Sequence, residues 1–179
     1  YIMQDLKEFR KIQGDDTLGG MVICETSEQA RRLYDVFQEE WQKYQPKPIK
    51  IKLPDGTFVV GEPEVDYKSK YRPLKAGIIL HDTDDKETRK QTVKDFKKNM
   101  TVDILIVFNM LLTGFDAPRL KRLYFGRKLK DHNLLQAITR VNRPYPGMRY
   151  GFVIDFADIK RNFKETNEAY LQELSLIHI

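Results

Sequence analysis

The sequence contains a single cysteine, Cys24, among 179 residues, so it can form no internal disulfide and no zinc site built from several thiolates. Cys24 ends a short apolar run, which indicates a buried strand residue rather than a reactive thiol. Long apolar runs are also lacking, since none approaches the roughly 20 residues that cross a bilayer, and no secretory signal pattern opens the sequence. We therefore expect a cytoplasmic protein without a membrane partner.

A complete phosphate-binding loop is lacking as well. Such a loop requires Gly-x-x-x-x-Gly-Lys followed by Ser or Thr. Gly14 and Gly19 have the right spacing, as do Gly56 and Gly61, but neither pair is followed by lysine. No apolar strand ends in an Asp-Glu pair suited to holding Mg²⁺. We therefore expect that this chain alone does not hydrolyse ATP.

The excess of positive charge is small. The 31 Lys and Arg residues against 26 Asp and Glu residues give a net charge of +5, which is compatible with a polyanionic partner but does not require one. Basic residues cluster in the segments 68–75 and 119–130. Either cluster could contact DNA phosphates, with binding that weakens as salt rises, or could be a solubilising surface. The sequence leaves both interpretations open, and nothing in it indicates base readout.

What the sequence does contain is an alternation of apolar runs and amphipathic helical patterns. The continuous apolar runs are typical of strands that are buried on both faces. Strands that alternate with helices predict an α/β domain in which helices cover both faces of a mostly parallel sheet. The expected strands are 20–24, 76–80, 103–108, 120–125 and 150–156, and the expected helices are 5–11, 26–44, 84–99, 132–142 and 159–174.

The segment at about 45–75 interrupts this alternation. Alternating residues at 49–53, a Pro-Asp-Gly turn and the apolar run 57–60 predict a β-hairpin. We interpret the segment as an insertion in a core domain at 19–158. Residues 1–18 are then a lead-in segment, and 159–179 are the start of a C-terminal helical region. Both ends stop within a pattern, and we interpret them as cuts through a longer protein.

The helix expected at 132–142 carries the first candidate site. Gln136, Arg140 and Arg143 are spaced by four and three residues, so they lie on one face. The apolar residues of this helix lie on the opposite face. Two arginines and a glutamine directed at one place could neutralise an anion. A solvated polar face with surface ion pairs would have the same spacing.

Thr113, Gly114 and Asp116 form the second candidate site, just past the carboxyl end of the strand expected at 103–108. Open parallel sheets bind ligands at that edge, and glycine permits a tight turn and a close backbone approach. Asp116 could accept hydrogen bonds from a ribose, and Thr113 could contact a phosphate. A plain turn, with Asp116 capping the next segment, is the alternative.

Three segments together resemble a known family. The segments NMLLTGFDAP at 109–118 and QAITRVNRPY at 136–145 are similar to motifs V and VI of superfamily-two helicases, and MVICETS at 21–27 resembles their motif IV. The first two are most similar to the motor (R) subunit of type I restriction endonucleases. The resemblance covers about 19–158 without the insertion. It implies the second RecA-like lobe of an ATP-dependent translocase on double-stranded DNA.

The resemblance also implies roles for individual residues. Arg143 would be the arginine finger that reaches the γ-phosphate, with Arg140 beside it and Gln136 in support. Asp116 would contact the ribose, and Gly114 would also line the nucleotide site. The residues expected at the DNA are Thr113, Thr26 and Ser27.

The partners and cofactors implied by the resemblance belong to a full-length protein. They are ATP with Mg²⁺, a first RecA-like lobe of the same polypeptide, double-stranded DNA, and the modification and specificity subunits of a restriction endonuclease complex. The sequence departs from the common helicase pattern, because Thr139 and Asn142 stand where glycines are frequent and Thr113 where arginine is frequent. A repair or remodelling helicase is one alternative. A catalytically silent α/β domain that binds nucleic acid or protein is another.

Two further patterns imitate metal sites. Pro54-Asp55 followed by Asp66-Tyr67-Lys68 resembles the pattern of a metal-dependent nuclease, but a hairpin turn explains the first part better. The acidic residues after His81 are better explained by a strand end followed by a helix cap. We therefore expect no metal site in this chain.

Overall fold

The computed structural model describes residues 1–43, 49–52, 57–61, 73–81, 85–110, 115–129 and 131–158, with the isolated residues 164 and 168. The helix expected at 159–174 and most of the insertion at 45–75 lie outside the described residues. Among the residues described, no helix is long and apolar enough to span a membrane.

The core is a five-stranded sheet in which all neighbouring strands are parallel, in the order β4-β5-β1-β6-β7. Its two central pairs join β1 to β5 and to β6, and β1 is buried along its whole length. The predicted α/β class with a parallel sheet is therefore confirmed. The strands are β1 (Gly19–Ile23), β4 (Ala76–Ile79), β5 (Ile104–Val107), β6 (Leu120–Phe125) and β7 (Phe152–Asp155).

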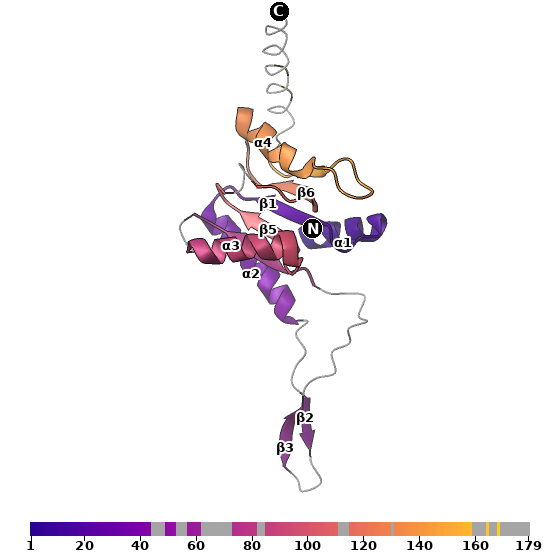
Figure 1. Cartoon of the computed structure of the whole chain (residues 1–179). Coiled ribbons are helices and arrows are strands. Elements are labelled where there is room, and N and C mark those ends of the chain that lie inside the picture. The colour runs from indigo at the N-terminus through magenta and orange to yellow at the C-terminus, as the bar shows by residue number, and fades with distance from the viewer. Residues whose placement is uncertain are drawn as a thin grey trace, which may run out of the picture.

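The predicted hairpin is also confirmed. Strands β2 (Ile49–Lys52) and β3 (Phe58–Gly61) pair antiparallel and form a two-stranded sheet separate from the core sheet (Figure 1). The hairpin therefore interrupts the α/β alternation in the sequence without entering the parallel sheet.

Helices cover both faces of the parallel sheet. Helices α1 (Ile2–Gln13) and α2 (Ser27–Lys43) contribute to the apolar cluster on one face. Helix α3 (Lys86–Lys94) with its π-helical continuation η1 (Asp95–Asn99), together with α4 (Asp131–Val141), packs against the other. Figure 1 shows α2 and α4 on opposite sides of the strands. This arrangement follows from apolar strands that need cover on both faces.

The lead-in segment 1–18 packs tightly against the sheet. Leu6 and Phe9 of α1 are buried in the apolar cluster beside α2. Arg10 is also buried; its Nε donates to the carbonyl of Leu18 at 2.6 Å, and one of its terminal nitrogens forms an ion pair with Asp103 at 2.9 Å. Buried charges are costly unless they are paired, and here both groups are paired.

The basic cluster at 119–130 is not a single surface, so neither interpretation of it, DNA contact or solubilising surface, holds for its buried residues. Arg119 is buried and donates to the carbonyls of Phe96 and Val102, and desolvation lowers its pKa to about 10. Lys121 is fully buried, and Arg122 pairs with Asp5 at 3.2 Å. These three cations lie on β6 or directly before it, and their contacts within the fold mean that they are not displayed to DNA.

The helix expected at 84–99 is confirmed, since α3 and η1 together run from Lys86 to Asn99. Asp85 caps its start by accepting a hydrogen bond from the amide of Thr88 at 2.6 Å. The last turn is π-helical, and it stops at Met100, whose φ of 54° is left-handed. Met100 is exposed, because a residue that closes a helix in this conformation turns the chain away from the helix face.

Candidate functional site

The segment that follows β5 presents one acidic side chain by burying its two neighbours. Phe115 and Ala117 belong to the apolar core, whereas Asp116 between them is exposed. The ring of Phe115 packs 6.0 Å from that of Phe96, centroid to centroid. This anchoring holds Asp116 on the surface. Thr113 and Gly114 lie outside the described residues, so their predicted roles stay predictions.

Helix α4 packs on the sheet as its pattern predicted. Leu134, Ala137 and Val141 are buried, and the polar face points away from them. Arg140 donates from that face to the main-chain carbonyl of Phe115 at 3.1 Å. The Oε1 atom of Gln136 is buried and accepts no hydrogen bond from the residues that the structure describes.

Arg143 lies just beyond the end of α4 and reaches the same segment. Its Nε atom is 3.6 Å from a carboxylate oxygen of Asp116, and the two side chains are 45% and 58% exposed. An ion pair this exposed and this long is weak, because water screens it. An external anion could therefore displace Asp116 from the guanidinium at small cost. The two predicted constellations, Asp116 and the arginines, are brought together.

Their location differs from the prediction in one respect. The sequence places Asp116 at the carboxyl edge of the sheet, but residues 115–118 already lead toward the amino end of β6. The carbonyl of Arg143 accepts a hydrogen bond from Lys121, the second residue of β6, so this cluster lies toward the opposite edge. The reason is topological: β5 and β6 are both parallel to β1, so the chain must cross the sheet between them.

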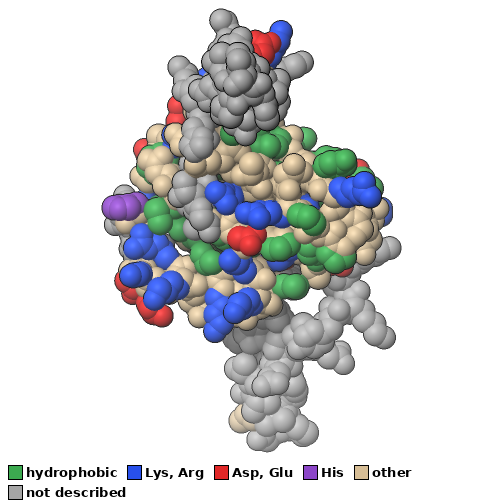
Figure 2. All heavy atoms as spheres, turned by 45° about the horizontal axis from the view of Figure 1, so that its top comes forward, with side chains coloured by type: hydrophobic (Ala, Val, Ile, Leu, Met, Phe, Trp, Pro, Cys, Tyr) green, Lys and Arg blue, Asp and Glu red, His purple; other side chains and the backbone are tan. Residues whose placement is uncertain are grey.

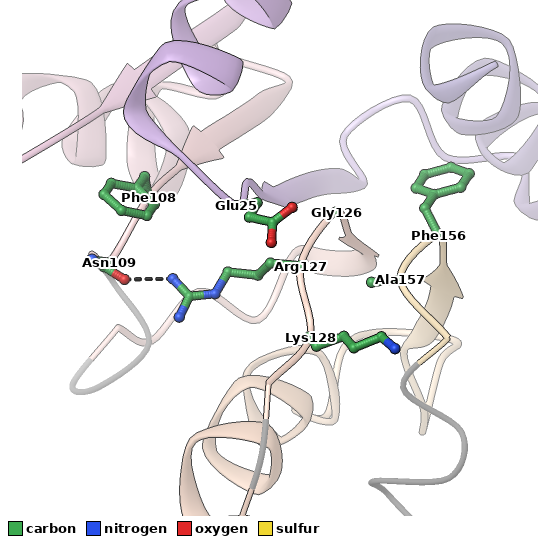
Figure 3. A pocket seen from close by; sticks show the side chains of 8 residues that line it. All are labelled: Glu25, Phe108, Asn109, Gly126, Arg127, Lys128, Phe156 and Ala157. Carbon is green, nitrogen blue, oxygen red and sulfur yellow. Dashed lines mark hydrogen bonds between the residues drawn. The ribbon is translucent and has the colours of Figure 1, made fainter.

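The carboxyl edge itself holds a second site, an open pocket of about 520 Å³. In it Arg127 donates to the side-chain oxygen of Asn109 at 2.5 Å, and Glu25 and Lys128 flank this pair (Figure 3). The pocket lies at the carboxyl ends of the strands, where the strand order reverses. This switch point is the usual ligand position in such folds. The lining residues are Glu25, Phe108, Asn109, Gly126, Arg127, Lys128, Phe156 and Ala157.

Part of this pocket carries a signal in the sequence. Arg127 and Lys128 belong to the same basic segment of the sequence as the buried cations of β6. The one feature that distinguishes these two residues from the buried cations is their position directly after the end of a strand. Gly126 is needed there, because a Cβ atom at this position would lie 3.0 Å from the carbonyl oxygen of Ile23. Figure 2 shows Lys and Arg side chains gathered on the face turned toward the viewer, with fewer acidic ones.

Thr26 and Ser27, predicted at the DNA, follow Glu25 at the start of α2. The hydroxyl oxygen of Thr26 accepts a hydrogen bond from the amide of Gln29 at 3.0 Å, so Thr26 caps the helix. This explains the local structure. Both residues are next in sequence to the lining of the carboxyl-edge pocket.

The sequence matches the family described as type I restriction enzyme subunit R domain 3 over residues 65–158. Similar curated proteins include a putative MjaVIIP endonuclease subunit of Methanocaldococcus jannaschii, 47% identical over 77 residues, which are 43% of this chain and 7% of that protein. A SauCOLORF180P endonuclease subunit of Staphylococcus aureus is 41% identical over 80 residues, 44% of this chain and 8% of that protein. Both are described as type I restriction enzyme subunits, and the match spans less than a tenth of either.

Solved structures share the fold at low sequence identity. Domain 2 of the DEAD-box helicase Mss116p, bound to an RNA duplex, has a TM-score of 0.59 at 16% identity, covering 94% of this chain and 54% of that one. Dbp5 of S. cerevisiae, bound to RNA and ADP BeF3, has a TM-score of 0.54 at 17% identity, covering 93% of this chain and 34% of that one. The parallel sheet is therefore that of a RecA-like helicase lobe.

Proposed function

This chain belongs to the family of type I restriction enzyme R subunits, and we propose that it is the second motor lobe of an ATP-dependent translocase on double-stranded DNA. In this proposal Arg143 is the arginine finger and Arg140 lies beside it. The ATP is held mainly by a first RecA-like lobe of the same, longer polypeptide. The modification and specificity subunits of the restriction complex are the proposed partners.

One observation carries the proposal: two segments that are distant in sequence meet at one exposed place. Arg140 binds the carbonyl of Phe115, and Arg143 lies 3.6 Å from Asp116. The result is an exposed guanidinium on a main chain that the fold tethers through the carbonyl of Arg143, and this guanidinium is open to an external anion. Phosphoryl transfer develops negative charge that a positioned arginine stabilises, and such an arginine raises rates by roughly 10³–10⁵.

The residues present fit one side of a nucleotide. The exposed carboxylate of Asp116 can accept hydrogen bonds from ribose hydroxyls once Arg143 turns to the phosphates. The buried oxygen of Gln136 needs a donor, which a neighbouring lobe can provide. Among the described residues no group of His, Cys, Asp or Glu could hold a metal ion. We assign the phosphate loop and the Mg²⁺ ligands to the first lobe.

The carboxyl-edge pocket is the proposed contact with the DNA backbone. Its Arg127 and Lys128 supply positive charge. Thr26 and Ser27, which follow the lining residue Glu25 in the sequence, are proposed to join them. Thr113, which follows β5 in the sequence, is proposed to contribute as well. Contacts of this kind bind phosphates and carry no sequence information, which suits a motor that must move over any sequence.

The test is DNA-stimulated ATP hydrolysis by the complete R subunit that contains this chain, comparing wild type with Arg143→Ala. We expect kcat to fall by two or more orders of magnitude, with nucleotide binding largely kept. Arg149→Ala is the matched control, because Arg149 is an exposed arginine on the same α4–β7 connection. Its activity should match that of the wild type. Unchanged hydrolysis in Arg143→Ala would make the lobe a silent scaffold and end the proposal.

A further inference from the structure

Lys121 is a charged residue at a position where the fold calls for an apolar one. It lies on β6, its side chain is completely buried, and it faces α4. Leu123 and Phe125, two and four residues further on, share this face of the strand and belong to the apolar core. Desolvation lowers the pKa of Lys121, which reflects the cost of burying its ammonium group. A leucine would fill the position without that cost.

The hydrogen bonds of Lys121 show what the charge accomplishes. Its Nζ atom donates to the carbonyl of Val141, at 3.5 Å, and to the carbonyl of Arg143. Val141 is the last residue of α4, where helix carbonyls lack intrahelical donors and a cation is favourable. Arg143 is the exposed arginine itself. Lys121 therefore binds the main chain at the last residue of α4 and again at Arg143, where the chain leaves the helix.

Two other contacts restrict the same stretch of chain. Gly151 packs so closely on the end of α4 that a Cβ atom there would lie 2.3 Å from the carbonyl oxygen of Val141. The hydroxyl of Tyr145, two residues after Arg143, lies 2.7 Å from the hydroxyl of Thr17. Arg143 is thus an exposed residue in a short segment that is anchored before it and after it.

We propose that Lys121 is a positioning residue, which fixes the backbone of Arg143 so that its guanidinium reaches the nucleotide from one defined point. The proposal rests on the arginine-finger function of Arg143. Lys121 itself touches no substrate. Without the ammonium, the carbonyls of Val141 and Arg143 lose their donor and the segment gains freedom, so the guanidinium occupies its productive position for a smaller part of the time.

The experiment replaces Lys121 by methionine, which has a similar shape and no charge, in the complete R subunit. We expect Lys121→Met to lower kcat for DNA-stimulated ATP hydrolysis by about 10²-fold, as a misplacement on the order of 1 Å does. The KM for ATP should change little. A readout independent of turnover is hydrogen exchange without nucleotide, in which the amides of residues 142–148 should exchange faster than in the wild type.

A double variant separates positioning from general damage. When Arg143→Ala is already present, Lys121→Met should cause no further loss of kcat, because there is no guanidinium left to position. A purely structural role would reduce the active fraction by the same factor with and without Arg143→Ala. If Lys121→Met lowers kcat by the same factor in both cases, the proposal is overturned. Arg10→Met is the control, since Arg10 is a buried cation bound to a main-chain carbonyl on the other face of the sheet. It should lower the unfolding midpoint while keeping kcat.

If Lys121→Met does not fold, Gly151→Ala carries the same test. Its Cβ atom pushes the end of α4 while Lys121 is retained, so the same loss of kcat, and the same absence of further loss with Arg143→Ala, is expected. A kcat in either variant equal to that of Arg10→Met would refute the positioning role. Full activity of Arg143→Ala alone would refute the arginine finger instead, so the two failures are distinguishable.

Discussion

The carboxyl-edge pocket makes a prediction about the salt dependence of DNA binding. Arg127 and Lys128 are two cations in one open pocket, and the hydrogen-bond partner of Arg127 is the neutral side chain of Asn109. Neither positive charge is cancelled by that hydrogen bond. The double variant Arg127→Ala/Lys128→Ala should therefore remove two phosphate contacts if the pocket follows the DNA backbone.

The size of the effect follows from counterion release. Each neutralised phosphate contributes about −0.9 to the slope of log K against log salt for duplex DNA, so losing two reduces the slope by about 1.8. Between 50 and 200 mM salt, the loss of affinity should then be about 12-fold smaller for the double variant than for the wild type. Glu25→Gln, which removes the carboxylate of the same pocket, should tighten binding.

The assay is a salt titration of fluorescent duplex DNA with the complete R subunit, read by anisotropy. Lys86→Ala/Lys90→Ala removes the same charge from exposed positions on α3, which lies beside β4 at the far end of the sheet. Its slope should equal that of the wild type. Equal slopes for the pocket variant and this control would show that the pocket does not contact DNA phosphates.

Two further predictions concern stability. Burial raises the pKa of the Cys24 thiol from 9.0 to about 11, so the thiol of the unfolded chain loses its proton first. The free energy of unfolding should therefore fall by about 2–3 kcal/mol as pH rises from 9 to 11. In urea unfolding, Cys24→Ala should lack this part of the decline, and a decline identical to that of the wild type would contradict the raised pKa. Asp103→Asn leaves Arg10 buried without its ionic partner and should cost about 3–5 kcal/mol of unfolding free energy, whereas Glu28→Gln, in the exposed pair with Arg32, should cost less than about 1 kcal/mol; equal costs would refute the importance of the buried pair.

Local patterns predicted most of the fold because each element carries its own signal. The strands read as apolar runs, and the alternation of Phe115, Asp116 and Ala117 already indicates which side chain faces outward. The convergence of Asp116 with the arginines of α4 was anticipated through family resemblance. The sequence did not predict at which edge of the sheet this cluster lies. That location depends on how the chain crosses between β5 and β6, and so on strand order, which no local pattern records.

The buried cations could not be predicted for a related reason. Lys121 and Arg119 look like surface residues when only sequence neighbours are considered. Lys121 is tolerated inside because the carbonyls of Val141 and Arg143 accept its hydrogen bonds. Arg119 is tolerated because carbonyls at residues 17, 96 and 102 accept its hydrogen bonds. A strand buried on both faces can therefore contain charge wherever tertiary structure provides acceptors.

Helix α4 starts three residues after Lys128 of the carboxyl-edge pocket and ends where Lys121 holds the chain before Arg143. Its 11 residues make a rod of about 16 Å. In the proposed motor this helix couples the DNA side of the lobe to the nucleotide side, since a shift of a rigid helix at its first turn moves its last turn by a comparable amount. The length of α4 therefore fixes how far the two proposed contact regions of the lobe lie from each other along this helix.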